Sequence, residues 1–241
     1  MNPVLLGDLV PAQEQSWHGL LELAERVPRH WCLVGGQMVF LLCRERGALA
    51  QRATTDADAV IDVRAHPGIH AEVTGALSDL GFVPSGESLE GHQHRWVRGS
   101  AHIDLMLPSG VGERAARRRG ATGGTLPEAP GANGALARAE RVEVVLNGMR
   151  GAVWRPRLLG AIAMKAAAFA QPGGQHRDRH LIDIAVLAAL VEPSDVRGFE
   201  PSTNERKRII SAVGSLANDS ARLATIPGAR DGLERLRLAF G

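Results

Sequence analysis

The spacing of hydrophobic and polar positions changes after Pro156. Before this proline, runs with apolar residues at every second position alternate with runs in which they recur every three or four residues, as in strands and helices. After it, the helical spacing continues to the end of the chain, with breaks at prolines such as Pro193 and Pro201. We therefore predict an α/β domain over residues 1–155, followed by a helical domain over residues 156–241.

The individual elements follow from the same patterns. In the first part we place helices over 16–28, 37–47 and 67–81, and strands over 30–36, 56–63, 94–99, 101–108, 141–148 and 151–156. The last four strands are predicted to form two hairpins, because Gly99-Ser100 and Asn147-Gly148 are turn-forming pairs. Residues 109–133, rich in Gly, Arg, Ala and Pro, are predicted to form a long surface loop.

Composition narrows the class of protein. The apolar fraction of 44% is ordinary for a soluble protein with a buried core. The formal net charge of +2 does not by itself predict nucleic-acid binding. Basic residues are concentrated in two runs, over 114–119 and 206–208, and such runs are solvated faces more often than phosphate-binding patches.

The sequence also bears on location. No run reaches the roughly 18 uncharged apolar residues of a membrane span, and the N-terminus lacks the basic segment of a signal peptide. Cys32 and Cys43 stand in apolar stretches and are too far apart for a CxxC motif, so we expect buried free thiols. These features predict a cytoplasmic protein with no membrane partner.

Three carboxylates are candidates for a metal site. Asp56 and Asp58 begin the predicted strand 56–63, and they share a face because side chains two apart on a strand point the same way. Such a pair repels unless one takes up a proton or a cation lies between them, and hard oxygen ligands favour Mg²⁺. Asp104, in the apolar strand 101–108, is the candidate for a third carboxylate; the alternative is an aspartate on the exposed face of an edge strand.

Gly35 and Gly36 form a second candidate element. They end a predicted strand and directly precede a helix, so free backbone N–H groups lie at the positive end of the helix dipole. Without side chains, the pair allows a phosphate to come close. A tight strand-to-helix turn with no ligand is the alternative, and for a Gly pair taken alone it is the commoner one.

In their order along the chain, these elements resemble a known family. The Gly pair, a helix, the string Arg52-x-Thr54-x-Asp56-x-Asp58 and a later strand aspartate are similar to the nucleotidyltransferase superfamily of the DNA polymerase β type. The spacing looks most like the AbiEii/AbiGii toxin branch of that superfamily.

The second half of the chain extends the resemblance. Pro156 opens a Pro-x-Leu-Leu helix start, Lys165 follows, and RDRHLID at 177–183 resembles the R-D-K-D-L-x-D string of that branch. His180 is a departure, because it stands where the branch has an acidic residue. The resemblance covers roughly residues 30–190.

The resemblance implies both a fold and a reaction. The fold is α+β: a nucleotidyltransferase fold with a small mixed β-sheet and flanking helices, followed by a helical C-terminal domain. The reaction is transfer of a nucleoside monophosphate (NMP) from a nucleoside triphosphate (NTP) to an acceptor hydroxyl, with release of pyrophosphate. Two Mg²⁺ ions, or Mn²⁺ in their place, would be the cofactors, because a two-metal site stabilises both the attacking and the leaving oxygen.

The same resemblance assigns roles to the charged residues. Asp56, Asp58 and Asp104 would hold the metals, and Asp104 would also help to deprotonate the acceptor hydroxyl. Lys165 would reach the triphosphate and offset charge on the leaving pyrophosphate. Asp183 would orient Lys165 or contact the base and ribose of the NTP.

The remaining predicted NTP contacts lie in the first half. Gly35 and Gly36 would cradle the triphosphate. Many nucleotidyltransferases have Gly-Ser at this point, so this chain lacks that hydroxyl, and Gln37 is the candidate to replace it. Arg52 would either touch a phosphate or brace its own loop.

Three functions are open at this stage. The first is toxin-like transfer to RNA, at the 3′ end of tRNA, with the basic run 114–119 on backbone phosphates and a cognate antitoxin protein as partner. The second is transfer to a small molecule, an aminoglycoside or lincosamide, whose positive charge would favour an acidic cleft; candidate acids are Asp79, Glu87, Glu90 and Glu113. The third is a non-catalytic nucleotide- or partner-binding protein on the same fold. The intact carboxylates count against the third, since without a metal they would only repel.

Overall fold

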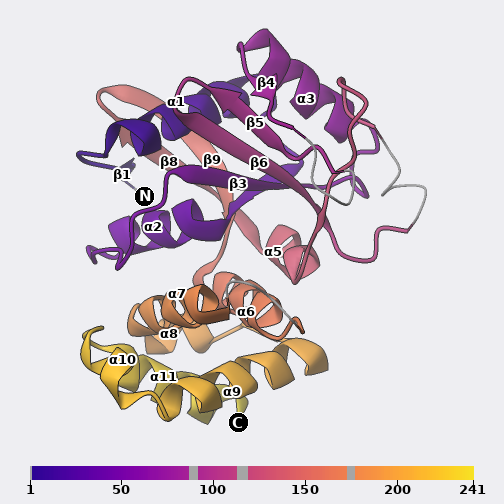
Figure 1. Cartoon of the computed structure of the whole chain (residues 1–241). Coiled ribbons are helices and arrows are strands. Elements are labelled where there is room, and N and C mark those ends of the chain that lie inside the picture. Colours follow the sequence, from indigo (N-terminus) through magenta and orange to yellow (C-terminus); the bar gives the residue numbers. More distant parts are fainter. Residues whose placement is uncertain (1, 87–91, 113–118, 173–176) are drawn as a thin grey trace.

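Two β-sheets lie above a group of C-terminal helices (Figure 1). The computed structural model describes residues 2–86, 92–112, 119–172 and 177–241. The strands are β1 (Val4–Leu5), β2 (Trp31–Val34), β3 (Asp56–Ile61), β4 (Val83–Pro84), β5 (Arg95–Arg98), β6 (Ala101–Pro108), β7 (Glu128–Ala129), β8 (Ala139–Leu146) and β9 (Met149–Pro156). The larger sheet has the order β2-β3-β6-β5-β4, with β7 paired to β6, and the smaller sheet has the order β1-β8-β9.

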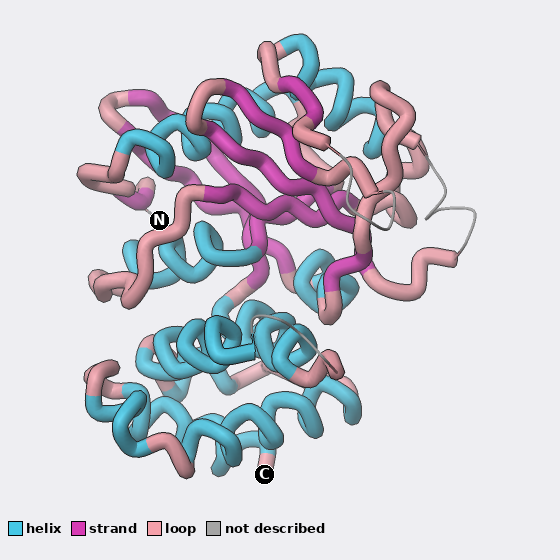
Figure 2. Tube along the Cα trace, viewed as in Figure 1, coloured by secondary structure: helices cyan, strands magenta, loops and turns pink. Residues whose placement is uncertain are grey.

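The helices occupy both sides of the sheets and the whole C-terminal part. They are α1 (Pro11–Arg26), α2 (Gly35–Glu45), α3 (Ile69–Asp79), α5 (Ala132–Ala137), α6 (Leu158–Phe169), α7 (Arg177–Ala189), α8 (Pro193–Val196), α9 (Thr203–Ala217), α10 (Ser220–Ala224) and α11 (Ala229–Phe240). Figure 1 shows α1 and α3 on one side of the larger sheet and α2 and α5 on the other. In Figure 2 the strands all lie in the upper part, and the helices after β9 form the lower part. None of the described helices is long and apolar enough to cross a membrane.

The larger sheet is mixed, as predicted. Strand β3 runs parallel to β6, whereas β2 is antiparallel to β3 and β5 is antiparallel to β6. Both predicted hairpins are confirmed: β5 and β6 turn at Gly99-Ser100, and β8 and β9 turn at Asn147-Gly148. A turn of two residues fixes which residues face each other, and this register becomes important at the site.

The prediction of one long loop over 109–133 is wrong in its last part. Glu128–Ala129 forms β7, which pairs in parallel with the end of β6, and Ala132 begins α5. A strand of two residues has no periodicity of its own, so only its tertiary partner shows that it exists. Residues 113–118 of the predicted loop lie outside the described residues.

Helix boundaries also shift from those predicted. The first helix begins at Pro11, because proline is favoured in the first turn, where its missing N–H costs no hydrogen bond. Helix α2 begins at Gly35, so the Gly pair belongs to the first turn of the helix. The helix over Leu158–Phe169 is buried on nearly every side, which suits its uniformly apolar sequence.

Apolar packing connects the two parts of the chain. One cluster of buried side chains includes Leu20 and Leu33 from the first part and Ile162 and Leu236 from the second. The division into two domains at residue 155 therefore stays a prediction. The thiols of Cys32 and Cys43 are free and buried, as expected.

The contact between α11 and α7 depends on Gly232. A Cβ added there would lie 1.8 Å from the carbonyl oxygen of Ala188, a backbone atom that cannot turn aside. We expect Gly232→Ala to lower the free energy of unfolding by about 2–3 kcal/mol, because overpacking outweighs the better helix propensity of alanine. Urea unfolding measures this, with Gly214→Ala in α9 as the control.

Gly214 is a matched control because a Cβ there meets no atom within 4 Å. Its replacement should stabilise the protein by about 0.5–1 kcal/mol through helix propensity alone. Equal effects of the two substitutions would contradict close packing of α11 on α7.

Candidate active site

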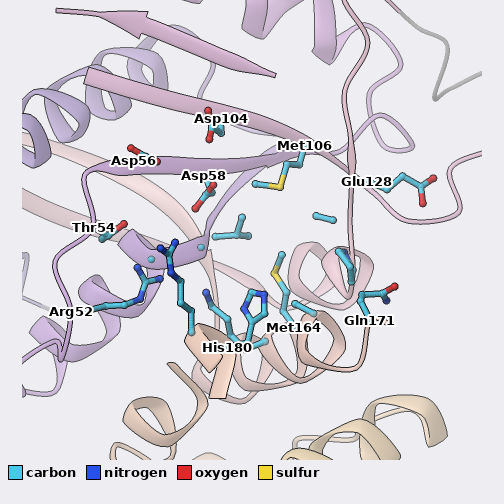
Figure 3. Close-up of a pocket in the computed structure, with 18 residues that line it drawn as sticks. Arg52, Thr54, Asp56, Asp58, Asp104, Met106, Glu128, Met164, Gln171 and His180 are labelled. Carbon is cyan, nitrogen blue, oxygen red and sulfur yellow. The ribbon is translucent and has the colours of Figure 1, made fainter. Parts of the chain in front are cut away.

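A cavity of about 500 Å³ lies between the larger sheet and the helices α6 and α7. Asp56, Asp58 and Asp104 form its wall on the sheet side, and Arg52 and Lys165 line the opposite side. Figure 3 shows the three carboxylates above the cavity and Arg52 below it. The structure thus brings the three predicted metal ligands and four of the predicted NTP contacts, Gly35, Gly36, Arg52 and Lys165, to one place.

The strands place the three carboxylates next to one another. Asp58 on β3 is the direct register partner of Asp104 on β6, and Asp56 lies two residues earlier on β3. Strand β6 is an interior strand, with β3 on one side and β5 on the other, and Asp104 is only 7% exposed. The alternative of an exposed aspartate on an edge strand is therefore excluded.

Two further residues from β5 and β6 hold these carboxylates. Arg95 donates from Nε to Oδ1 of Asp104 at 2.8 Å, and from Nη2 to Oδ2 of Asp104 at 2.7 Å. The same Nη2 lies 3.0 Å from Oδ2 of Asp56. On the other side of Asp56, Nδ1 of His102 lies 3.1 Å from Oδ1. Arg95 therefore bridges Asp56 and Asp104.

The two aspartates on β3 differ in charge balance. Burial opposes ionisation of Asp56, but the hydrogen bond with His102 and the charge of Arg95 outweigh it and hold the pKa of Asp56 below its usual value. Burial, together with the charge of Asp104, raises the pKa of Asp58 to about 6. Asp58 is thus the carboxylate whose charge is least well neutralised.

The Gly pair lies directly under this carboxylate. Gly35 has φ +65°, and a Cβ added there would lie 1.7 Å from Oδ2 of Asp58. A Cβ on Gly36 would lie 2.5 Å from Oγ1 of Thr54, and the backbone N–H of Gly36 hydrogen-bonds to Asp58. Both glycines line the cavity, and their small size lets the first turn of α2 approach β3.

Gln37 faces away from the cavity. It is fully buried, and its Oε1 accepts hydrogen bonds from Nε2 of Gln13 at 3.0 Å and from Nε1 of Trp17 at 2.8 Å. Its own Nε2 donates to the carbonyl oxygen of Thr54 at 2.8 Å. These bonds tie α2 to α1 and to the loop before β3, and Gln37 does not line the cavity, contrary to its predicted place among the NTP contacts.

Asp183 holds the cationic side of the cavity together. Its Oδ2 accepts from Nζ of Lys165 at 2.7 Å, and Nε of Arg52 donates to its Oδ1 at 3.1 Å. Lys165 and Asp183 are both buried, at 5% and 2% exposure. The predicted orienting role of Asp183 toward Lys165 agrees with this geometry, and Arg52 braces its loop through the same carboxylate.

Residues that the sequence prediction missed also line or support the cavity. Glu128, Arg179 and His180 are on its wall, and Arg95 holds two of the three carboxylates. A signal for Arg95 was present: a two-residue turn at Gly99-Ser100 puts Arg95 opposite Asp104, and opposite charges across a strand pair attract.

A divalent metal fits the chemistry of this donor set. Three carboxylates, the hard oxygen donors that Mg²⁺ prefers, lie on adjacent strands, and burial together with the charge of Asp104 raises the pKa of Asp58. Among the described residues, however, no three His, Cys, Asp or Glu side chains converge closely enough to hold a metal. Nη2 of Arg95 contacts both Asp56 and Asp104 instead.

A solved structure shares this fold. An antigenic nucleotidyltransferase-like protein from Paracoccidioides brasiliensis matches with a TM-score of 0.53 and 17% identity, over 90% of this chain and 95% of that one. The antibiotic-resistance factor ANT(2'')-Ia matches over 96% of this chain and 92% of its own, at 15% identity and a TM-score of 0.40, too low to relate the two in detail. No family model and no curated protein matches the sequence.

The chain therefore has a nucleotidyltransferase fold, in the predicted α+β form of mixed sheet, flanking helices and C-terminal helices. The AbiEii/AbiGii branch stays a prediction.

Proposed function

We propose that this protein transfers an NMP group from an NTP to an acceptor hydroxyl. The observation that carries the proposal is the pairing of Asp58 with Asp104 on adjacent strands, with Asp56 beside them and Lys165 across the same cavity. Carboxylates opposite cations suit a substrate whose triphosphate needs both metal ions and positive side chains.

The residues of the chain divide the work between two sides. Asp56, Asp58 and Asp104 would hold two Mg²⁺ or Mn²⁺ ions, and the chemistry that such ions supply is stabilisation of charge on the attacking and leaving oxygens. Lys165 and Arg179 line the cavity and would offset negative charge on the triphosphate and on pyrophosphate. The N-terminal turn of α2 would add the positive end of a helix dipole.

An RNA acceptor is the first choice of substrate. A second cavity of about 680 Å³ shares Pro130 and Gln171 with the first, so a long acceptor can extend beyond the reacting group. Asn133, Asn204 and Arg208 line this second cavity, and amide and guanidinium groups are common contacts of a nucleic-acid backbone. Arg208 belongs to the basic run 206–208, which thus reaches a cavity wall.

The other basic run contributes little to this argument. Residues 114–118 lie outside the described residues, and Arg119 donates to the carbonyl oxygen of Gly123 at 2.7 Å. Transfer to the 3′ end of tRNA and a cognate antitoxin partner rest on the AbiEii resemblance alone, and both stay predictions.

A small-molecule acceptor is the second choice, favoured by Glu128. Glu128 lines the first cavity, its two carboxylate oxygens lie 3.2 and 3.3 Å from the backbone N of Gly110, and its charge would attract a cationic aminoglycoside or lincosamide. Asp79, another predicted cleft acid, lines neither cavity and lies 3.7 Å from Arg26. The remaining candidates, Glu87, Glu90 and Glu113, lie outside the described residues.

The non-catalytic alternative gains one observation. Arg95 neutralises Asp56 and Asp104, so these two carboxylates do not need a metal to coexist. The repulsion between carboxylates still counts against a non-catalytic role at Asp58, because burial and the charge of Asp104 raise the pKa of Asp58 to about 6. A buried carboxylate of this kind is costly to a protein that makes no use of it.

A transfer assay tests the proposal. The protein, Mg²⁺ and each α-labelled NTP are incubated with total tRNA and, separately, with a panel of aminoglycosides and lincosamides. We expect label on tRNA with one preferred NTP, lost in Asp58→Asn and kept in the exposed control Asp79→Asn. Label on a drug alone would move the protein to the second choice. No label on any acceptor, together with no binding of NTP and Mn²⁺ in calorimetry, would overturn the proposed function.

A further inference from the structure

One guanidinium group connects two of the three carboxylates of the proposed site. Nη2 of Arg95 lies 2.7 Å from Oδ2 of Asp104 and 3.0 Å from Oδ2 of Asp56, so a single nitrogen contacts both carboxylates. Nε of Arg95 adds a bond of 2.8 Å to the other oxygen of Asp104. A cation shared by Asp56 and Asp104 would need the place that this nitrogen occupies.

Arg95 contacts Asp104 more strongly than Asp56, so the contact with Asp56 is the one that can open. Arg95 forms a bidentate pair with Asp104, and the side chain of Asp104 is only 10% exposed. With Asp56 it forms one contact, and the side chains of Arg95 and Asp56 are 35% and 39% exposed. The bond to Asp56 is therefore the weaker one, since a partly exposed single contact is worth less than a buried bidentate pair.

Asp56 keeps a second partner when that bond opens. Nδ1 of His102 lies 3.1 Å from Oδ1 of Asp56, on the side away from Arg95. The carboxylate would remain beside Asp58 on β3 without Arg95. Loss of the arginine contact thus leaves Asp56 positioned and its Oδ2 available to a new ligand.

We propose that Arg95 takes the place of a divalent cation in the metal-free protein, and that metal binding requires Nη2 of Arg95 to leave Asp56. This inference rests on the proposed function, because it concerns the same carboxylates. Arg95 is a positioning residue: it limits repulsion between Asp56 and Asp104 while no metal is bound, and it weakens metal binding by competition. Two positive groups cannot share the same two oxygens without strong repulsion.

The test is the affinity for Mn²⁺ alone, measured by isothermal titration calorimetry on the purified full chain. Arg95→Gln should bind Mn²⁺ about tenfold more tightly than the unchanged protein, because the competing charge is gone. Arg95→Lys keeps a positive charge but cannot bridge two carboxylates in the same way, so its affinity should lie between the two. This variant also guards against a folding defect in Arg95→Gln.

Arg98 provides the matched control on the same strand. It donates to the carbonyl oxygen of Leu80 at 2.9 Å, pairs with Glu22 and lies over the ring of Phe82, away from the cavity. Arg98→Gln should lower the melting temperature in EDTA without changing the affinity for Mn²⁺. The rise in melting temperature on adding Mn²⁺ should be larger than normal in Arg95→Gln and normal in Arg98→Gln.

The outcomes separate this inference from the proposed function. If the unchanged protein binds Mn²⁺ and Arg95→Gln binds it equally or more weakly, competition by Arg95 is wrong and the proposed function stands. If Arg95→Gln binds Mn²⁺ and the unchanged protein does not, the inference is supported. If neither protein binds Mn²⁺, with or without NTP, the proposed function fails and the inference fails with it.

Discussion

Asp58→Asn should lower the rate of NMP transfer on the order of a thousandfold, because under the proposed function it removes a metal-binding carboxylate and with it several kcal/mol of transition-state stabilisation. The same substitution should stabilise the metal-free protein. Asparagine has nearly the shape of aspartate and still accepts the hydrogen bond from the N–H of Gly36, but it carries no charge. Activity and stability should therefore change in opposite directions.

The pH dependence of this stabilisation follows from the pKa of Asp58. Burial beside Asp104 raises that pKa from 3.8 to about 6, so the folded protein holds the proton more tightly than the unfolded chain. Protonation of Asp58 therefore stabilises the fold of the unchanged protein. This stabilisation is complete below pH 3.8 and is lost as the pH rises through 6. A shift of about two units corresponds to roughly 3 kcal/mol, which is the largest gain we expect from Asp58→Asn above pH 6.

Urea unfolding in EDTA at pH 7.5 and pH 4 measures the gain, which should shrink at the lower pH. Asp79→Asn is the control and should change neither activity nor stability, because the side chain of Asp79 is 74% exposed. Full transfer activity in Asp58→Asn would rule out the metal-ligand role of Asp58. A loss of stability in Asp58→Asn at pH 7.5 would contradict the charge imbalance around Asp58.

Asp183→Asn should lower the free energy of unfolding by about 3–5 kcal/mol, the cost of leaving a buried charge without its partner. Asp183 accepts hydrogen bonds from Lys165 at 2.7 Å and from Arg52 at 3.1 Å. Burial opposes its ionisation, but the charge of Lys165 and the hydrogen bond from Arg52 outweigh burial and hold the pKa of Asp183 below its usual value. The substitution would remove the carboxylate that is ion-paired with the buried ammonium group of Lys165, and only the charge of Asp58 across the cavity would remain to offset it.

The effect should reach beyond the pair itself. Asp183 on α7 joins Lys165 on α6 and Arg52 in the loop before β3, so one carboxylate connects three segments. The double variant Asp183→Asn/Lys165→Met should recover part of the lost stability, because no unpaired ammonium group remains. Its recovery would separate the cost of the buried charge from the cost of lost packing.

Asp178→Asn on the same helix is the matched control. The side chain of Asp178 is 86% exposed, so its loss should cost no more than about 0.5 kcal/mol in urea unfolding. If Asp183→Asn and Asp178→Asn are equally stable, the buried pair of Lys165 and Asp183 does not stabilise the fold. The depressed pKa gives a second check: the contribution of Asp183 is fully present above its unfolded pKa and should be lost as the pH falls through its lower folded pKa.

Most of the secondary structure could be predicted because its causes are local. Alternation of apolar and polar residues marks β3, a short apolar run marks β6, and the two-residue turns at Gly99-Ser100 and Asn147-Gly148 define both hairpins. The short strand Glu128–Ala129 could not be predicted, since two residues have no period. Its position depends on the end of β6, which lies about twenty residues earlier in the chain.

The sequence predicted all three aspartates that line the cavity. Of the basic residues it predicted Arg52 and Lys165 but missed Arg95 and Arg179. Strand periodicity places Asp56 and Asp58 on one face, whereas Asp104 joins them through its position in an apolar strand and through the family resemblance. Gln37 was misplaced for a physical reason: the direction of a side chain in the first turn of a helix depends on which neighbours satisfy it, and here they are Gln13 and Trp17.

By itself, the sequence determined the types of the main elements, the two hairpins and the set of carboxylates, because propensity, periodicity and turn chemistry act between near neighbours. Only the tertiary structure decided which strands lie side by side, and hence that Asp58 faces Asp104 and that Arg95 bridges Asp104 to Asp56. It also decided that Asp183 joins Lys165 to Arg52. These contacts join residues distant in sequence, and their energies depend on burial and charge, which exist only once the chain has packed.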